Sequence, residues 1–386
     1  MSRAELVAAA LDRKARGTFP LDFCGSSVTG IADRALEKLL AALGLPGDRR
    51  PVDSVQGISA PAPAIIFALG SSTLRIGRDR ILPGTPSPEG VSTARDRFGV
   101  HWRRGVGELY FSQVGAPLGE GRLRDALDAY VFPEPEAAGI DESIAEGRAA
   151  AEGFGLFPVL DRDCAGIYEM AARLRGVERL YYDLLDDPEG VDALAERILD
   201  YKLRYWSLVL EAWGKAPAAI AEADDYGSEQ SLLFAPDLIR GLFISRYRRL
   251  LGTIKRKCPA ARVVFHSCGA VREILPALIE AGIDALNPVQ FTAAGMGLEG
   301  LVRDFGDRIA FWGGAVDTKV VLTTGSPEDL RKELSHNAAI LGSRGGFVCS
   351  TVHNIQADVP VENILAYLEA ARGLGLAEAR GAGRAA

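Results

Sequence analysis

Short apolar segments alternate with longer helix-like segments from about residue 151 onward, and this alternation constrains the fold more than any other feature of the chain. Six of the apolar segments fit buried β-strands, at residues 155–160, 218–223, 262–266, 282–287, 308–312 and 346–351. Near-continuous apolar strands that alternate with helices are typical of a parallel sheet with helices on its faces. Several such units in succession favour a closed barrel over an open sheet.

The helices between these strands begin and end at recognisable residues. Asp187 and Pro188 provide an N-cap and a first-turn proline for one helix. Ser326 begins another helix in the same way, and Asp329 follows it at the spacing of a capping box. Gly282 has the position of a helix C-terminal stop. These boundaries predict regular βα units in the second part of the chain.

We interpret residues 1–373 as one barrel domain. Residues 1–150 are less regular, and we expect them to hold an N-terminal elaboration, which covers part of the barrel, and the first barrel elements. Residues 151–373 hold the regular βα units. The segment 374–386 is rich in Gly, Ala and Arg and is expected to be a disordered tail.

The bulk composition excludes several classes of protein. A net charge of −7 and a pI near 5.4 argue against nucleic-acid binding, which needs a basic surface. No apolar segment approaches the roughly 20 residues that span a bilayer, and residues 1–17 lack the apolar core of a signal peptide. Five scattered cysteines do not resemble a disulfide framework. We therefore expect a soluble, cytoplasmic protein that binds neither nucleic acid nor membranes. Its oligomeric state stays open, a homodimer included.

Chemically versatile residues gather where the predicted strands end. In parallel barrels, functional groups collect at the carboxyl ends of the strands. The residues at these positions are Glu222, Asp224, Asp225, Tyr226, His266, Cys268, Asn287, Gln290, Gly313, Cys349 and His353. The core of a soluble protein does not need polar and ionisable residues after so many successive strands. We therefore expect a functional site at this end of the barrel.

His266 and Cys268 are candidate metal ligands at the end of one predicted strand. Residues i and i+2 of an extended segment point to the same side, so the imidazole and the thiol can converge on one ion. Nitrogen and sulfur ligands of this kind suit zinc. Cys349 and His353 are the candidates for a further ligand. Their structural alternatives are a small buried thiol and a hydrogen-bonded loop histidine.

The acidic segment that begins at Glu222 has a functional and a structural interpretation. Carboxylates at a barrel mouth can act as general acids, position a substrate or complete a metal shell. In this interpretation Glu222 and Asp225 are catalytic, and Asp224 and Tyr226 bind substrate. In the structural interpretation, Asp225 caps the following turn and Glu222 pairs with an arginine.

Asn287, Gln290 and Gly313 are candidate substrate-binding residues. The two amide side chains offer neutral donors and acceptors that suit a polar substrate, although an Asn-Pro turn also uses such bonds internally. A glycine at a strand end allows a ligand to approach the backbone closely.

Several segments resemble the uroporphyrinogen decarboxylase superfamily, and together they cover nearly the whole chain. The most specific are Phe265-His266-Ser267-Cys268-Gly269, Asn287-Pro288-Val289-Gln290, Phe311-Trp312-Gly313-Gly314 and His353-Asn354-Ile355-Gln356. Residues 223–227 and 96–99 carry a weaker resemblance. The resemblance implies an α/β fold of the (β/α)8 TIM barrel type.

This superfamily contains decarboxylases and corrinoid-dependent methyltransferases. The decarboxylases carry an N-terminal arginine-rich signature and a central aspartate, whereas residues 19–27 here contain no arginine and residues 70–73 no aspartate. The methyltransferases bind zinc through a His-x-Cys motif and a later cysteine. His266 and Cys268 match the first two ligands. His353 stands in the place of the later cysteine, with Cys349 four residues before it.

The resemblance therefore implies a zinc-dependent methyltransferase that moves a methyl group between a small substrate, a methyl ether or a thiol, and a corrinoid. The chain has no D-x-H-x-x-G pattern for cobalamin binding, so the corrinoid would belong to a separate partner protein. One alternative is a metal-free decarboxylase of a tetrapyrrole or another carboxylate, with Asp224 or Asp225 as the acid. Another is a non-catalytic protein that binds a corrinoid or a small ligand. The methyl donor or acceptor and the direction of transfer stay open.

Overall fold

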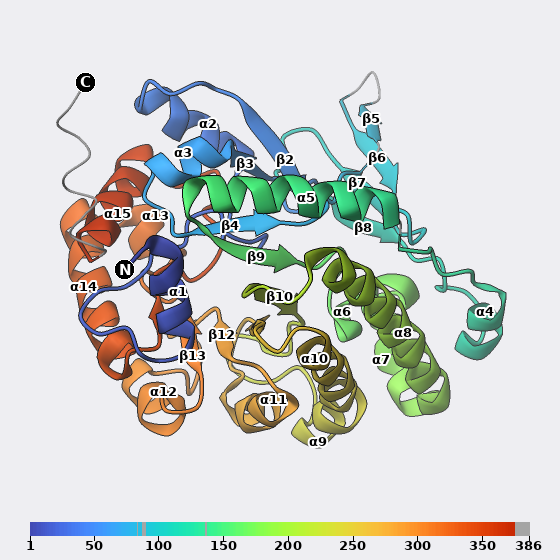
Figure 1. The fold of residues 1–386 in the computed structure, drawn as a ribbon. Coiled ribbons are helices and arrows are strands. Elements are labelled where there is room, and N and C mark those ends of the chain that lie inside the picture. Colours follow the sequence, from blue (N-terminus) through green and yellow to red (C-terminus); the bar gives the residue numbers. More distant parts are fainter. Residues whose placement is uncertain (83, 87–89, 136, 375–386) are drawn as a thin grey trace.

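The computed structural model describes residues 1–82, 84–86, 90–135 and 137–374. Its central sheet is parallel, with the strand order β14-β13-β12-β11-β10-β9-β4. The strands of this sheet are β4 (Thr73–Ile76), β9 (Phe157–Asp161), β10 (Ala219–Ala223), β11 (Arg262–His266), β12 (Ala285–Asn287), β13 (Ala310–Trp312) and β14 (Phe347–Val348). The sheet curls, and helices surround it (Figure 1).

A short segment around Leu21 closes this sheet into a barrel. Leu21 forms a parallel bridge with Cys349, which directly follows β14. The Asp22 amide donates to the Cys349 carbonyl at 2.8 Å, and the Ser72 amide donates to the Leu21 carbonyl at 2.7 Å. Leu21 therefore lies between β14 and β4 and completes the ring. The predicted (β/α)8 TIM barrel is confirmed.

Each of the six predicted strand segments overlaps a barrel strand, and β11 has the predicted bounds. The strand β4 was not predicted. Its four residues alternate apolar Leu74 and Ile76 with polar Thr73 and Arg75, and so short an alternation differs little from a loop. Leu74 and Ile76 pack in the outer core, while Arg75 bonds to Asp161 of β9.

Helices cover the outer face of the barrel (Figure 1). The α-helices other than α1 are α2 (Asp33–Ala42), α3 (Pro63–Ala68), α4 (Leu123–Ala129), α5 (Ala137–Phe154), α6 (Ile167–Arg175), α7 (Val177–Asp186), α8 (Pro188–Trp213), α9 (Pro236–Leu238), α10 (Ser245–Lys257), α11 (Leu275–Ala281), α12 (Leu298–Phe305), α13 (Val321–Thr324), α14 (Pro327–Leu341) and α15 (Val361–Gly373). Of these, α4 lies away from the barrel and packs against α8 (Figure 1). As predicted, Asp187 caps α8, Ser326 caps α14 through a capping box with Asp329, and Gly282 ends α11. No helix among the described residues is long and apolar enough to cross a membrane.

The helix α1 (Arg3–Leu11) closes the amino-terminal end of the barrel. Its buried side chains Leu6, Val7 and Leu11 pack against small inward-facing residues of the strands. These strand residues include Val159, Ala219, Ala221, Val264, Ala285, Ala310 and Val348. Several of these residues are the first of their strands, so α1 lies at the end of the barrel where the strands begin. The carboxyl ends of the strands form the opposite end, which we call the barrel mouth.

Two small antiparallel sheets come from the N-terminal part of the chain. One has the order β1-β3-β2 and contains β1 (Ile31–Ala32), β3 (Ile58–Pro61) and β2 (Arg49–Asp53). The other is formed by β5 (Gly84–Pro86), β6 (Ser92–Arg95), β7 (His101–Arg104) and β8 (Ser112–Gly115). Residue 150 lies inside α5, so the helix runs through the predicted limit of the elaboration. The predicted tail lies outside the described residues from residue 375 onward.

Candidate metal centre at the barrel mouth

Three side chains that can bind a metal converge at the barrel mouth: His266, Cys268 and His353. One ligand atom from each residue lies within 4.8 Å of the other two. Cys268 Sγ lies 3.3 Å from His266 Nε2, and the ring centroids of His266 and His353 are 5.4 Å apart. Nitrogen and sulfur donors in this number fit a zinc site with one open coordination position.

The turn after β11 positions the first two of these residues. His266 is the last residue of β11, and the following backbone is held by two side chains. Asp225 Oδ1 accepts a hydrogen bond from the Cys268 amide at 2.8 Å, and Gln290 Oε1 accepts one from the Gly269 amide at 2.9 Å. Gly269 has φ +83°, a conformation that favours glycine. Gln290, a predicted substrate-binding residue, therefore supports the loop that carries Cys268.

Asn354 fixes the loop that carries His353. Its Oδ1 accepts a hydrogen bond from the Gly30 amide at 2.7 Å. Its Nδ2 donates to the Ser27 carbonyl and to Gln56 Oε1, both at 3.1 Å. The position of His353 thus depends on the N-terminal part of the chain, more than 290 residues away.

Asn287 orients the ring of His266. Its Oδ1 lies 2.5 Å from His266 Nδ1, and its Nδ2 donates to the Trp312 carbonyl at 3.0 Å. The second bond assigns the amide orientation, so an acceptor oxygen faces the ring. The proton of the neutral imidazole then lies on Nδ1, and Nε2 presents its lone pair to the cluster. Asn287 was predicted to bind substrate, and the structure places it behind a candidate ligand.

Replacing Asn287 with alanine is expected to weaken zinc binding roughly 10-fold to 100-fold, because the His266 ring loses its hydrogen-bond partner. Competition with a chromophoric chelator measures this affinity. Asn363→Ala is the matched control, since the amide nitrogen of this buried side chain donates to the carbonyls of Leu322 and Gly325 and the residue is not one of the converging ligands. Wild-type affinity in Asn287→Ala, or an equal loss in both variants, would contradict the assigned role.

Burial controls the protonation of the cluster. It lowers the pKa of His266 to about 4. Burial, with the neighbouring His266, also lowers the pKa of His353 to about 4. Burial and the charge of Asp225 raise the pKa of the Cys268 thiol well above its ordinary value. Both histidines are therefore neutral donors at pH 7, and a metal that binds here would displace the thiol proton.

Glu222, predicted to be catalytic, is not brought to this cluster. Alternate residues of a strand face opposite sides, so Ala221 packs inside the barrel and Glu222 points outward to α8. Its Oε2 lies 2.9 Å from Lys202 Nζ, and its Oε1 accepts a hydrogen bond from Trp206 Nε1 at 2.5 Å. The structural alternative named an arginine as the partner of Glu222. The partner is Lys202.

Asp224 and Tyr226 anchor α6 and do not reach the cluster. Asp224 accepts hydrogen bonds from the Tyr168 and Glu169 amides at 2.8 and 3.0 Å, at the start of that helix. The Tyr226 hydroxyl donates to Asp224 Oδ2 at 2.8 Å. Both residues are fully buried, in contrast with the predicted contacts to a substrate.

Cys349 and Gly313 also make their contacts within the barrel itself. Cys349 is buried beside Leu21 in the barrel wall, and the structure brings His353 to the cluster in its place. Gly313 has φ +90°, and a Cβ there would lie 2.9 Å from the Thr351 carbonyl oxygen. The turn after β13 therefore requires glycine for its own packing.

Two charged residues at this end were missed from the sequence. Asp161 ends β9, and Arg162 follows it directly. Asp161 is buried, with Oδ2 at 2.7 Å from Arg75 Nε and Oδ1 accepting a hydrogen bond from Ser27 Oγ at 3.2 Å. Polar residues follow the predicted strand 155–160, just as they do the strand that ends at His266. The same reasoning could therefore have indicated Asp161 and Arg162.

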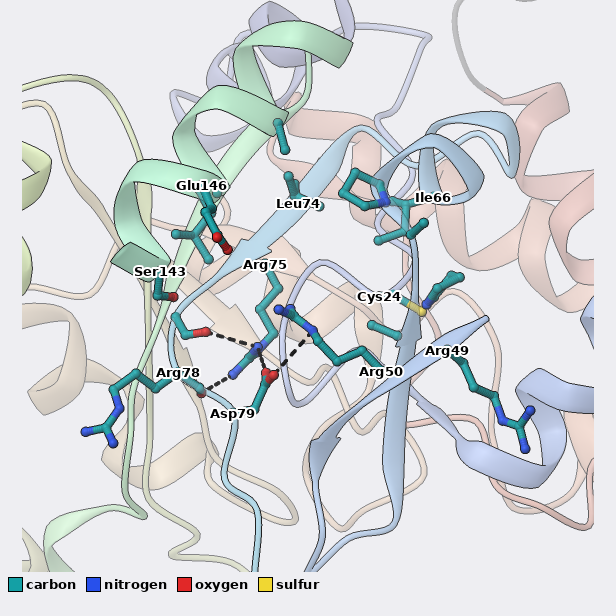
Figure 2. A pocket seen from close by; sticks show the side chains of 18 of the residues that line it. Cys24, Arg49, Arg50, Ile66, Leu74, Arg75, Arg78, Asp79, Ser143 and Glu146 are labelled. Carbon is teal, nitrogen blue, oxygen red and sulfur yellow. Dashed lines mark hydrogen bonds and ion pairs between the residues drawn. The ribbon is translucent and has the colours of Figure 1, made fainter. Parts of the chain in front are cut away.

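A cavity of about 710 Å³ lies away from the cluster, between the β2–β3 hairpin, β4 and α5 (Figure 2). Arg50 and Arg75 both pair with Asp79 there, at 3.2 and 2.8 Å. None of the three candidate metal ligands lines this cavity. It is therefore distinct from the candidate metal centre.

The fold and the cluster together define a (β/α)8 barrel with a candidate His-Cys-His metal centre at its mouth. Residues 164–374 match the family described as Uroporphyrinogen decarboxylase (URO-D), which is more than half of the chain. The chain therefore belongs to the uroporphyrinogen decarboxylase family. No curated protein sequence matches it.

A solved structure shows the same architecture. A methyltransferase from Methanosarcina mazei is similar to this chain with a TM-score of 0.66 and 17% sequence identity, over 97% of this chain and 99% of that one. At this identity the likeness shows the fold alone. A D-psicose 3-epimerase also matches, with 12% identity over 65% of this chain and 89% of that one, but its TM-score of 0.33 carries no argument.

Proposed function

We propose that this protein is a zinc-dependent methyltransferase that moves a methyl group between a small substrate and the corrinoid of a partner protein. The observation that carries the proposal is the convergence of His266, Cys268 and His353 at the barrel mouth. Three protein ligands leave a position for the substrate, as in other catalytic zinc sites. A methyltransferase from Methanosarcina mazei has the same fold, so the barrel is compatible with this class of reaction.

The donor set fits zinc, since it combines neutral imidazoles with a thiol in a partly buried cluster. Bound there, zinc supplies Lewis acidity, which lowers the pKa of a thiol or polarises the oxygen of a methyl ether. Asn287 keeps the proton of His266 on Nδ1. Asp225 Oδ1 lies 3.7 Å from His266 Nε2, and its side chain is 40% exposed, so it would pass a substrate proton to solvent. Of the two carboxylates predicted to be catalytic, it is the one beside the cluster.

The corrinoid would come from a partner protein, because the chain has no D-x-H-x-x-G pattern. The corrinoid would supply the cobalt that takes up or gives the methyl group. The tasks of the protein are then alignment of the two reactants and stabilisation of charge.

Metal removal tests the proposal. Purified protein is expected to hold about one zinc ion per chain. It should transfer a methyl group from methylcobalamin to a small thiol, or from a methoxylated aromatic to cob(I)alamin, and lose this activity after chelation until zinc is restored. Elemental analysis and the cobalamin absorbance spectrum measure both quantities. Full transfer by metal-free protein would rule the mechanism out.

The same experiment separates the alternatives. A metal-free decarboxylase would turn over a porphyrinogen or another carboxylate without zinc. Burial, with the nearby charge of Glu169, raises the pKa of Asp224 to about 7, which suits a general acid. Its oxygens are already engaged by two amides and by Tyr226, however, and the residue is fully buried, which favours Asp225 for this role. A non-catalytic protein would bind its ligand without turnover and would be unaffected by replacement of Cys268.

A further inference from the structure

Glu229 and Lys319 form an ion pair that connects two loops at the barrel mouth. Glu229 belongs to the loop after β10, and Lys319 belongs to the loop between β13 and α13. Glu229 Oε1 is the partner of Lys319 Nζ, and both side chains are more than half exposed. Because β10 and β13 are three positions apart in the sheet, the ion pair spans the carboxyl ends of β11 and β12.

The loop after β10 is packed against the loop that carries Cys268. The Ala270 amide donates a hydrogen bond to the Ser228 carbonyl at 2.8 Å. A Cβ at Gly227 would lie 2.7 Å from the Cys268 carbonyl oxygen, so the two backbones meet without space for a side chain. One end of the ion pair is therefore anchored beside a candidate metal ligand.

A compact turn carries Glu229 and holds its backbone in place. Ser228 Oγ accepts hydrogen bonds from the Gln230 and Ser231 amides at 3.2 and 3.1 Å. The Ala294 amide, in the loop after β12, donates to the Glu229 carbonyl at 2.8 Å. The turn thus stays bonded to its neighbours whether or not the Glu229 side chain is paired.

The loop after β13 is bonded to the loop that carries His353. The Val352 amide, directly before His353, donates to the Val316 carbonyl at 3.0 Å. Lys319 follows Val316 by three residues. The two partners of the ion pair are therefore anchored beside two different candidate ligands, and their side chains meet across the mouth between them.

We propose that the Glu229–Lys319 ion pair is a gate across the barrel mouth, which opens to admit a small substrate to the open coordination position of the candidate metal centre. This inference rests on the proposed function and adds control of access to its metal centre. Lys319 is the part that moves, because its ammonium lies at the end of a flexible four-carbon stem. Ion pairs between exposed side chains contribute little to stability, so the gate can open without disturbing the barrel.

Two other roles of this ion pair predict different results. As a brace, it would hold the two ligand loops together, and breaking it from either side would weaken metal binding. As a source of charge, loss of Glu229 would weaken the binding of a cation, whereas loss of Lys319 would strengthen it. A gate changes the rates of substrate entry and exit by the same factor and leaves both affinities unchanged.

Stopped-flow binding of neutral 2-mercaptoethanol to protein loaded with Co²⁺ tests this inference without turnover, because a thiolate on Co²⁺ gives an absorption band in the near ultraviolet. Lys319→Met and Glu229→Gln are each expected to raise the association and dissociation rate constants of the thiol roughly 2-fold to 5-fold, with its Kd unchanged. Added salt should bring the wild-type rates towards those of the variants, since screening weakens an exposed ion pair.

Two further variants serve as controls. Glu229→Lys combined with Lys319→Glu restores a pair of opposite charges and should return both rate constants to their wild-type values. Glu328→Gln removes a similarly exposed ion pair with Lys332 on α14, and it should behave as wild type.

The outcomes separate the gate from its alternatives and from the proposed function. Wild-type thiol kinetics in both single variants would refute the gate alone. Weaker Co²⁺ binding in both variants would replace the gate with a brace, and opposite changes in Co²⁺ affinity would replace it with an effect of charge. Failure of the wild-type protein to bind Co²⁺ or zinc would remove the proposed function itself.

Discussion

Replacing His266 with alanine or Cys268 with serine is expected to bring the zinc content of the purified protein to background and to reduce methyl transfer by roughly 1000-fold or more. Each change leaves only two of the three converging ligands, and two ligands do not hold the metal against solvent and buffer. His353→Ala should have the same effect. Elemental analysis of protein purified without added metal, followed by the cobalamin assay, measures both results.

Cys349→Ala is the matched control for this experiment. Cys349 is a buried thiol whose pKa burial raises to about 12, and it lies in the barrel wall outside the cluster. Its replacement should keep zinc and activity, with a small loss of stability from the missing sulfur. A loss of zinc in Cys349→Ala together with full zinc in His353→Ala would show that the third ligand has been misassigned.

Glu222→Ala is expected to lower the free energy of unfolding by about 3–5 kcal/mol, because it leaves the Lys202 ammonium buried without its carboxylate partner. Lys202 is 1% exposed, and its Nζ contacts both oxygens of Glu222. Trp206 Nε1 also loses its acceptor. Urea denaturation followed by tryptophan fluorescence measures the change.

A double variant separates the structural role of Glu222 from a catalytic one. Replacing both partners, as Glu222→Leu with Lys202→Met, should recover most of the lost stability, since neither charge is then left unpaired. If the double variant is stable and transfers methyl groups at a wild-type rate, Glu222 is a structural residue. A single variant that keeps its stability but loses activity would restore the catalytic role predicted from the sequence.

The acidic segment after residue 221 illustrates what strand periodicity leaves open. The sequence placed several carboxylates near the end of one strand, and it placed that end at the mouth of a barrel. It could not tell which side chains face inward, because the twist of the closing sheet and the packing of α8 settle that. Glu222 faces α8, Asp224 anchors α6, and Asp225 lies beside His266 and Cys268.

The local sequence pattern was sufficient to predict the βα units and the first two candidate ligands. His266 and Cys268 are two residues apart at the end of an apolar strand, and their convergence depends only on short-range backbone geometry. The closing of the ring by Leu21 and the position of His353 depend on contacts between segments hundreds of residues apart. Such contacts follow from how the barrel closes and which loops then meet at its mouth, and neither is encoded in the spacing of residues along the chain.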